Sequence, residues 1–380
     1  MIRRLYADNF LCLVNFEAQF ESMNLLMGVN GCGKSTILEL LSRIQRLVVA
    51  GVKIMEVFPP EDFTRWGQLD TQNFEMDVEG KEGSYTYKLR IEHTKDRKKE
   101  RIEREELLLD GKPLFLYEGG EAHLYHDDYE PGPVYPFDGS LSSLSIISPR
   151  QDNTKLTWFK DWLERLVILR PQPQSMAALS DEEADHLDRE GSNFASWYRF
   201  ISQEHQDKIF SLREKLKDVI PGFHAFKLEQ EGKARILKVG FTSDDKEKKN
   251  SPLYFDFDHL SDGQRILFVL YTLLCDAEGE RRTLLLDEPG NYLSLDEIQP
   301  WLVELSDICG EGTVQAILIS HNPELIDYLG GAYGLWMERE PLGPSRIKKL
   351  SLKLENGQKS EGTSERALKL SELVARGWLE

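Results

Sequence analysis

The sequence Gly28-Val-Asn-Gly-Cys-Gly-Lys-Ser-Thr36 decides how this chain of 380 residues can be interpreted. It fits the pattern G-x-x-x-x-G-K-[ST], in which a glycine-rich turn aims backbone N–H groups at phosphates and a helix N-terminus adds its positive end. The apolar residues 25–27 before it predict a strand, and residues 34–49 after it have helical spacing. We therefore expect a strand, a phosphate-binding turn and a helix within the first 50 residues.

This turn predicts a site for a nucleoside triphosphate. Lys34 is expected to reach the β- and γ-phosphate oxygens, and Ser35 to offer its hydroxyl to Mg²⁺. The residues expected to contact the nucleotide are Gly28, Asn30, Gly31, Cys32, Gly33, Lys34, Ser35 and Thr36.

A second segment places two carboxylates at the end of an apolar strand. Residues 283–286 read Thr-Leu-Leu-Leu and are followed by Asp287 and Glu288. Alone, this pattern would be a buried strand with an acidic exposed end. Together with a phosphate-binding turn, it predicts that Asp287 holds the metal ion and that Glu288 orients or deprotonates the attacking water.

Two further segments complete the candidate site. The sequence LSDGQR at residues 260–265 begins a predicted helix and, alone, would be an ordinary N-cap. The apolar residues 317–319 lead to a strand-end histidine, His321, which alone would more often be structural. Because these segments bracket the Asp-Glu pair in order, we predict that Ser261, Gly263 and Gln264 bind nucleotide and that His321 contacts the γ-phosphate.

The four segments, in this order, resemble those of the ATP-binding-cassette ATPases over the first 50 residues and residues 255–340. The resemblance implies an α/β P-loop NTPase fold of the ATP-binding-cassette type, with a mixed sheet core, an antiparallel β lobe and a short helical insertion. It also implies a homodimer that sandwiches ATP and Mg²⁺, in which Ser261 and the Gly263 backbone of one head face the γ-phosphate on the other. Asp262 stands where the family usually has glycine; a carboxylate there is unfavourable unless it points away or meets a cation.

The family also has a glutamine that senses Mg²⁺ at the end of a middle strand. Gln151, after a strand expected at residues 144–147, is our candidate, and Gln172 and Gln174 are alternatives. The opening hairpin looks like the start of RecF, Rad50 and SMC heads, where the adenine edge is lined. Asn9 and Phe10 are either part of that lining or strand-end core residues.

The segment between the motifs has its own organisation. Alternating apolar residues predict an antiparallel β lobe within residues 65–135, followed from 118 to 139 by a Gly/Pro-rich loop. Helical spacing predicts an insertion at about 155–222, including a helix over 156–169. Alternating helices and strands in the last third imply a parallel sheet. We assign residues 1–355 to the head and 356–380 to a C-terminal helix, amphipathic over 364–374.

Composition limits the class of protein. The net charge of −18 argues against a protein that coats nucleic acid, although the basic residues 95–104 are either a solvated hairpin or a patch facing DNA. Four widely spaced cysteines argue against a structural zinc site or disulfides. No signal peptide or membrane-spanning run is apparent, so we expect a soluble, cytoplasmic protein without a membrane partner.

Two functions remain open at this stage. Transporter subunits have a shorter insertion between these motifs, and SMC and Rad50 proteins have long heptad arms that are absent here. OLD proteins add a TOPRIM nuclease, but no acidic triad follows His321, so we expect no nuclease in this chain. We favour the ATPase and sensor subunit of a prokaryotic anti-phage defence system, acting on a separate effector such as a TOPRIM-like or other nuclease. The alternative is a RecF-like, ATP-dependent DNA clamp in repair.

Overall fold

The structure is a computed structural model, and it describes residues 1–66, 69–93, 100–242, 251–350 and 369–372. The chain divides into two compact units, Met1–Leu166 with Ile326–Glu380 and Val167–Leu325. The C-terminal helix expected over 356–380 lies almost entirely outside the described residues, and the boundary at residue 355 stays a prediction. In the part of the chain that is described, no helix is long and apolar enough to cross a membrane.

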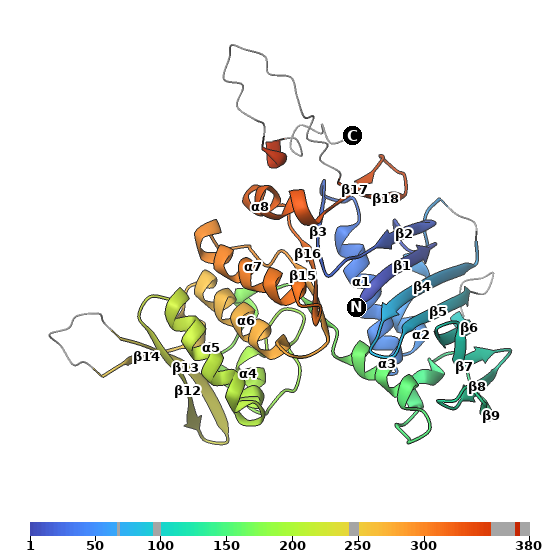
Figure 1. Ribbon diagram of the computed structural model, residues 1–380, viewed down its shortest axis with the longest axis horizontal. Coiled ribbons are helices and arrows are strands. Elements are labelled where there is room, and N and C mark those ends of the chain that lie inside the picture. The colour runs from blue at the N-terminus through green and yellow to red at the C-terminus, as the bar shows by residue number, and fades with distance from the viewer. Residues whose placement is uncertain (67–68, 94–99, 243–250, 351–368, 373–380) are drawn as a thin grey trace, which may run out of the picture. The chain divides into compact units, whose positions relative to one another are not determined.

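An antiparallel sheet makes up much of the first unit. Its strands lie in the order β2-β1-β4-β5-β6-β7-β8-β9 (Figure 1). Their bounds are β1 Ile2–Asp8, β2 Phe16–Gln19, β4 Thr71–Glu79, β5 Ser84–His93, β6 Glu100–Leu109, β7 Lys112–Glu118, β8 Glu121–Tyr125 and β9 Pro131–Pro136. Side chains alternate between its faces, so Tyr85 and Tyr87 point together and stack on Trp158 and Phe159 of helix α3, Thr154–Glu164.

The loop expected over residues 118–139 is wrong in part, because β8 and β9 lie within it. Glycine and proline in this stretch indicated a loop. In the structure β8 pairs with β7, and the proline-bearing β9 lies at the end of the sheet, where a missing N–H interrupts no ladder.

A second set of strands in the first unit carries the glycine-rich turn. Strand β3 (Met23–Gly28) runs parallel to β17 (Gly334–Arg339), which pairs antiparallel with β18 (Ser345–Lys349). Helix α1 (Lys34–Val48) starts directly after the turn and buries one apolar face. The short elements are α2 Ile54–Val57, η1 Pro60–Asp62 and η2 Ser143–Ile146. The strand expected at residues 144–147 is therefore wrong: this short apolar run forms the 3₁₀ turn η2.

The second unit contains a parallel sheet in the order β10-β15-β16. The bounds are β10 Val167–Leu169, β15 Arg282–Asp287 and β16 Val314–Ile319. This confirms the parallel pairing expected from alternating helices and strands. The helix expected over 156–169 ends at Glu164, however, and residues 167–169 are a buried strand, because pairing with β15 overrides a helical spacing too short to be decisive.

Helices and an antiparallel ribbon complete the second unit (Figure 1). The helices are α4 Phe194–Glu204, α5 Gln206–Val219, α6 Asp262–Ala277 and α7 Leu295–Gly310. Helix α8 spans Pro323–Tyr333, and most of it belongs to the first unit. The ribbon comprises β11 Leu179–Ser180, β12 Phe223–Glu231, β13 Ala234–Phe241 and β14 Leu253–Asp256, with η4 Phe257–His259 after it. The rings of Phe194, Phe226, Phe257 and Phe268 form the core between them, which fixes the start of α6.

Candidate active site

The glycine-rich turn in the first unit has the geometry of a phosphate cradle. Gly28, Gly31 and Gly33 have φ of 150°, 80° and 103°, a backbone region in which side chains are strained. A Cβ on Gly28 would collide with the carbonyl oxygen of Met337, because β17 runs directly beside β3. The ammonium of Lys34 lies over the turn and donates to the carbonyl oxygens of Gly28 (2.7 Å) and Val29 (3.2 Å). The turn thus presents a cation and backbone groups at the start of α1.

Residues distant in sequence hold this turn in shape. The hydroxyl of Ser345 donates to the carbonyl of Cys32 at 2.7 Å, and Arg339 donates to the carbonyl of Gly31 at 3.2 Å. The thiol of Cys12 lies 3.5 Å from the Thr36 hydroxyl. No local sequence pattern marks these braces, because Arg339 and Ser345 lie 308 and 313 residues after the turn residues that they hold. Burial raises the pKa of the Cys32 thiol, which keeps it protonated.

The second unit brings Glu288 and His321 into direct contact. Glu288 follows β15 with φ of 56°, a left-handed conformation uncommon for a residue with a side chain, and its N–H donates to Ile319 at the end of β16. Its Oε1 lies 2.5 Å from Nδ1 of His321 and accepts the His321 backbone N–H at 3.1 Å. The Ser320 hydroxyl donates to Oε2 at 3.2 Å. A carboxylate held by several donors keeps a fixed direction and can still accept a proton from water.

Asp287 is the last residue of β15 and is almost fully buried. Arg170, one residue after β10, lies 3.9 Å from its carboxylate. Two neighbouring parallel strands therefore place an acidic and a cationic side chain at the same edge of the sheet. Ligand-binding sites of parallel sheets form at this edge. The predicted roles of Asp287, Glu288 and His321 in hydrolysis stay predictions.

The segment at residues 261–264 forms the N-terminus of α6. Ser261 is the N-cap, and its hydroxyl accepts the Gln264 N–H while the Gln264 side chain accepts the Ser261 N–H, each at 3.3 Å. A Cβ on Gly263 would lie 2.9 Å from the Tyr292 carbonyl, so glycine is needed for close packing there. The side chains thus serve the ordinary capping role that the sequence also allowed. Binding of a γ-phosphate by Ser261, Gly263 and Gln264 stays a prediction.

The carboxylate of Asp262 does meet a cation. Arg265, one turn later on α6, donates to its Oδ1 at 2.5 Å, and Gln174 donates to its Oδ2 at 2.9 Å. The second guanidinium nitrogen of Arg265, Nη1, donates to the carbonyl of Pro173 at 2.6 Å. The departure from the family's glycine is therefore accompanied by a local counter-charge.

The three candidate glutamines lie in different surroundings. Gln151 is exposed in a turn of the first unit. Gln172 and Gln174 follow β10, whose neighbour β15 ends at Asp287, so both lie in the same unit as that carboxylate. Gln151 stays a prediction, and this placement supports the alternatives.

Asn9 and Phe10 are core residues. The Asn9 amide donates to the carbonyls of Leu69 and Thr71, and the Phe10 ring packs edge-on against Phe58 and Phe74. Both are almost fully buried. Of the two interpretations of this strand end, the structure supports core residues.

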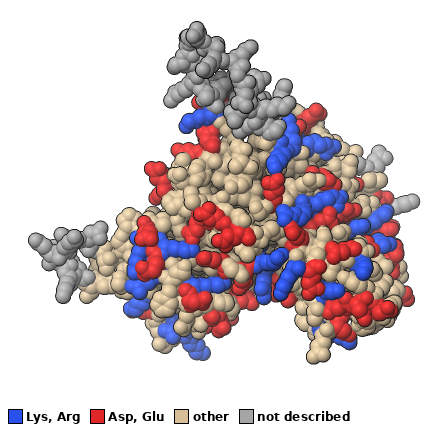
Figure 2. Space-filling view, viewed as in Figure 1, with Lys and Arg blue, Asp and Glu red and all other residues tan. Residues whose placement is uncertain are grey.

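In the basic segment at residues 95–104, residues 95–99 lie outside the described part, and residues 100–104 are the first residues of β6. In the described part, Arg101 pairs with Glu92, and Arg104 pairs with Glu106 and Glu118. Figure 2 shows the same mixture more widely, with Lys and Arg interspersed among Asp and Glu. These pairings support the solvated interpretation for the described residues 100–104 only.

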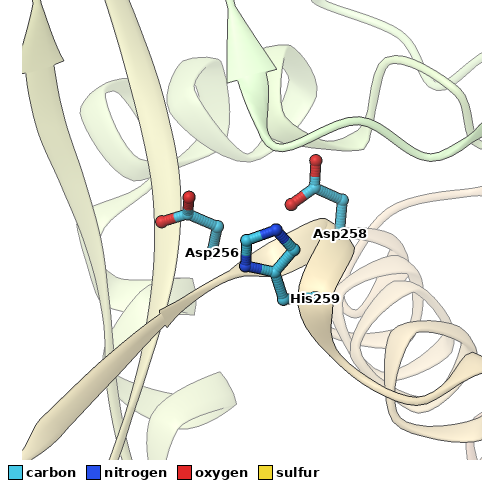
Figure 3. A group of neighbouring side chains, drawn as sticks. All are labelled: Asp256, Asp258 and His259. Atoms are coloured by element: carbon cyan, nitrogen blue, oxygen red, sulfur yellow. The ribbon is translucent and has the colours of Figure 1, made fainter.

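A group of possible metal ligands lies just before the Ser261 segment. One ligand atom each of Asp256, Asp258 and His259 falls within 4.8 Å of the others (Figure 3). Asp256 is also 3.5 Å from the ammonium of Lys238, and Asp258 and His259 are exposed. A cation on a neighbouring strand already compensates part of this charge, and the group adds acidic character to the surroundings of the α6 N-terminus.

The residues present suit Mg-ATP chemically. In the first unit, a glycine backbone with a lysine over it matches a polyphosphate, and the Ser35 hydroxyl is an oxygen of the kind that Mg²⁺ prefers. In the second unit, the carboxylate of Asp287 is a ligand of the same kind.

Comparison with known proteins agrees with the fold. Residues 143–327 match the family described as "AAA domain, putative AbiEii toxin, Type IV TA system". An SMC head bound to the C-winged helix domain of ScpA is similar, with a TM-score of 0.56 and 13% identity, over 93% of this chain and 98% of that chain. The SMC head domain from Thermotoga maritima has a TM-score of 0.47 and 15% identity, over 92% of this chain and 99% of that one. No curated protein sequence matches. At this identity the likeness concerns the fold, and it confirms the predicted P-loop NTPase class.

Proposed function

Because the chain has the fold of an ATP-binding-cassette ATPase head of the RecF and SMC group, we propose that it binds Mg-ATP at residues 28–36 and hydrolyses it when two heads close around the nucleotide. In this proposal Lys34 and the turn backbone hold the phosphates, and Ser35 and Asp287 hold Mg²⁺. Ser261, Gly263 and Gln264 of the second head complete the site. Mg²⁺ would neutralise phosphate charge.

The observation that carries the proposal is the orientation of Glu288. Its carboxylate is fixed by His321 and Ser320 at the end of β15, next to the buried Asp287. A carboxylate so fixed can direct a water molecule and accept its proton, while the exposed imidazole of His321 can contact the γ-phosphate. A purely structural acid at a strand end would not require a strained backbone and three donors.

The test is the variant Glu288→Gln in the full chain. The amide keeps the shape of the side chain but cannot accept a proton, so we expect ATP binding within about threefold of wild type and a rate of phosphate release lower by about a hundredfold or more. With ATP and Mg²⁺ this variant should accumulate as a dimer in sedimentation velocity. Hydrolysis at the wild-type rate would rule out Glu288 as the base.

For the biological role, we propose an ATP-controlled switch in a prokaryotic anti-phage defence system, acting on a separate effector. The description of the matching family, which refers to a toxin–antitoxin system, supports a defence context. The alternative, a RecF-like DNA clamp, predicts ATP-dependent and salt-dependent binding to duplex DNA by the chain alone. Pairing of the described hairpin cations with carboxylates disfavours it. The ATP-controlled switch would be supported if the protein product of a neighbouring gene co-purified with the Glu288→Gln chain and this chain did not bind DNA at low salt.

A further inference from the structure

Asp262 occupies a position that is physically suited to a phosphate. It is the first residue of α6, immediately after the N-cap Ser261. A helix N-terminus attracts anions through its unpaired N–H groups and its dipole. Asp262 therefore puts a negative charge at the N-terminus of α6. In the proposed function, this helix end faces the γ-phosphate that the partner head holds.

This carboxylate is held by its own head. Both of its oxygens are used, one by Arg265 at 2.5 Å and the other by Gln174 at 2.9 Å. The Arg265 side chain is 11% exposed and is anchored by the Pro173 carbonyl, whereas the Asp262 side chain is 35% exposed. The cation is thus buried behind the acid, and the acid lies on the solvent side.

The residues just before this helix end add negative charge. Asp256, Asp258 and His259 precede Asp262 within six residues (Figure 3). Among the residues that the structure describes, Lys238 pairs with Asp256, and it is shared with Glu229 on β12. Asp256 is therefore compensated by a cation on the neighbouring strand, whereas Asp262 is compensated by Arg265 of its own helix.

We propose that Asp262, with Arg265 as its built-in counter-charge, is a positioning residue that sets the threshold for ATP-driven closure of the two heads. The Asp262 carboxylate competes with the incoming γ-phosphate for the α6 N-terminus, and Arg265 limits that repulsion. This inference rests on the proposed function, because it requires the α6 N-terminus to face the nucleotide of a second head.

The experiment measures ATP-dependent dimerisation in a Glu288→Gln background, because slow hydrolysis there leaves the ATP intact while the dimer equilibrium is measured. Sedimentation velocity at fixed Mg-ATP gives the dimer dissociation constant for Glu288→Gln alone and with Asp262→Asn. The amide removes the charge but keeps hydrogen-bonding groups, so we expect dimerisation to tighten by about tenfold at low ionic strength. The gain should shrink as salt is raised, because charge repulsion is screened whereas a packing effect is not.

Asp296→Asn is the matched control. Asp296 is an exposed carboxylate in the first turn of α7, so this variant removes the same charge from another helix N-terminus in the same unit. It should leave the dissociation constant unchanged. Arg265→Met strips Asp262 of its counter-charge, so it should weaken dimerisation when the aspartate is present. Its effect should be smaller when it is combined with Asp262→Asn, because the carboxylate that it would unmask is then already neutral.

The outcomes separate the two proposals. If Glu288→Gln binds ATP but never dimerises, the proposed function fails. If it dimerises and Asp262→Asn has no effect, weakens the dimer, or tightens it equally at all salt concentrations, the role of Asp262 as a charge threshold is overturned. Equal tightening by Asp296→Asn would overturn it as well, since the effect would then be a general loss of net charge.

Discussion

The Nδ1 atom of His321 lies 2.5 Å from Oε1 of Glu288, so the residue expected to contact the γ-phosphate directly orients the residue expected to activate water. The contact joins the ends of two neighbouring parallel strands, β15 and β16. The His321 side chain is 60% exposed, whereas Glu288 is 13% exposed. The histidine can therefore respond to a ligand while the carboxylate stays fixed.

Replacement of His321 should slow hydrolysis without unfolding the protein. His321→Ala removes the Nδ1 contact from an exposed side chain, so we expect phosphate release to fall by about tenfold to a hundredfold with ATP affinity nearly unchanged. His321→Asn retains a donor close to the Nδ1 position and should recover part of the rate. Steady-state phosphate release checks both variants; equal rates for Ala, Asn and wild type would show that the contact has no catalytic role.

Ser345 should influence nucleotide affinity although it lies far from the turn in sequence. Ser345→Ala leaves the buried Cys32 carbonyl without its 2.7 Å donor, and we expect ATP affinity to fall by about fivefold. Calorimetric titration with ATP measures this. Thr272→Val is the control, because it removes a comparable buried hydroxyl-to-carbonyl bond within α6 and should reduce stability but not affinity.

The stability of the β lobe should depend on pH through Glu105. This carboxyl is fully buried beside Tyr87 and Ser142, and burial raises its pKa from 4.5 to about 7. A group with a raised pKa in the folded state stabilises that state fully below pH 4.5, and this contribution is lost as the pH rises through 7. Urea midpoints should therefore fall between about pH 5 and pH 8. The free energy of unfolding should fall by roughly 1.4 kcal/mol for each pH unit that separates the folded and unfolded pKa values.

Glu105→Gln is the matching variant for that pH dependence. The amide resembles the protonated acid in shape and hydrogen bonding, so it should be close to wild type at about pH 5 and more stable than wild type at about pH 8. Identical pH profiles for the two proteins would show that Glu105 is not the titrating group.

Magnesium titrations can distinguish the three glutamines. Gln172 follows the strand beside Asp287, and the Gln174 amide already binds Asp262, so we expect Gln172→Ala to raise the Mg²⁺ concentration needed for half-maximal hydrolysis the most. Gln151→Ala should change it least. If Gln151→Ala raised this Mg²⁺ concentration more than Gln172→Ala, Gln151 would again be the candidate for the glutamine that senses Mg²⁺.

The parts of the site that sequence could predict are those in which chemistry and spacing are local. The turn at residues 28–36 combines glycine, lysine and a helix start within nine residues, and β15 ends at once in two carboxylates. The strands β3 and β15 that lead to these residues are buried over almost their whole length and are therefore rich in apolar residues. Burial on both sides makes the last four residues of β16, 316–319, a continuous apolar run that indicates a strand before His321.

The remaining features depend on contacts between distant residues. Strand β10 has only three residues, so its pairing with β15 and not its own pattern makes it a strand. Ser345 and Arg339 reach the turn through the pairing of β17 with β3. The pairing of Asp262 with Arg265 is a local contact within α6, whereas Gln174 reaches Asp262 only because the segment after β10 lies beside the start of α6.

The most direct test of the central claim mixes two inactive variants. Lys34→Ala should lose ATP binding, and Ser261→Asp keeps a good N-cap while setting a negative charge at the α6 N-terminus. If each site uses the turn of one head and Ser261 of the other, a mixed dimer has one intact site, so an equimolar mixture should recover at most about a quarter of the wild-type ATPase rate. No recovery from two folded, separately inactive variants would contradict a site shared between two heads.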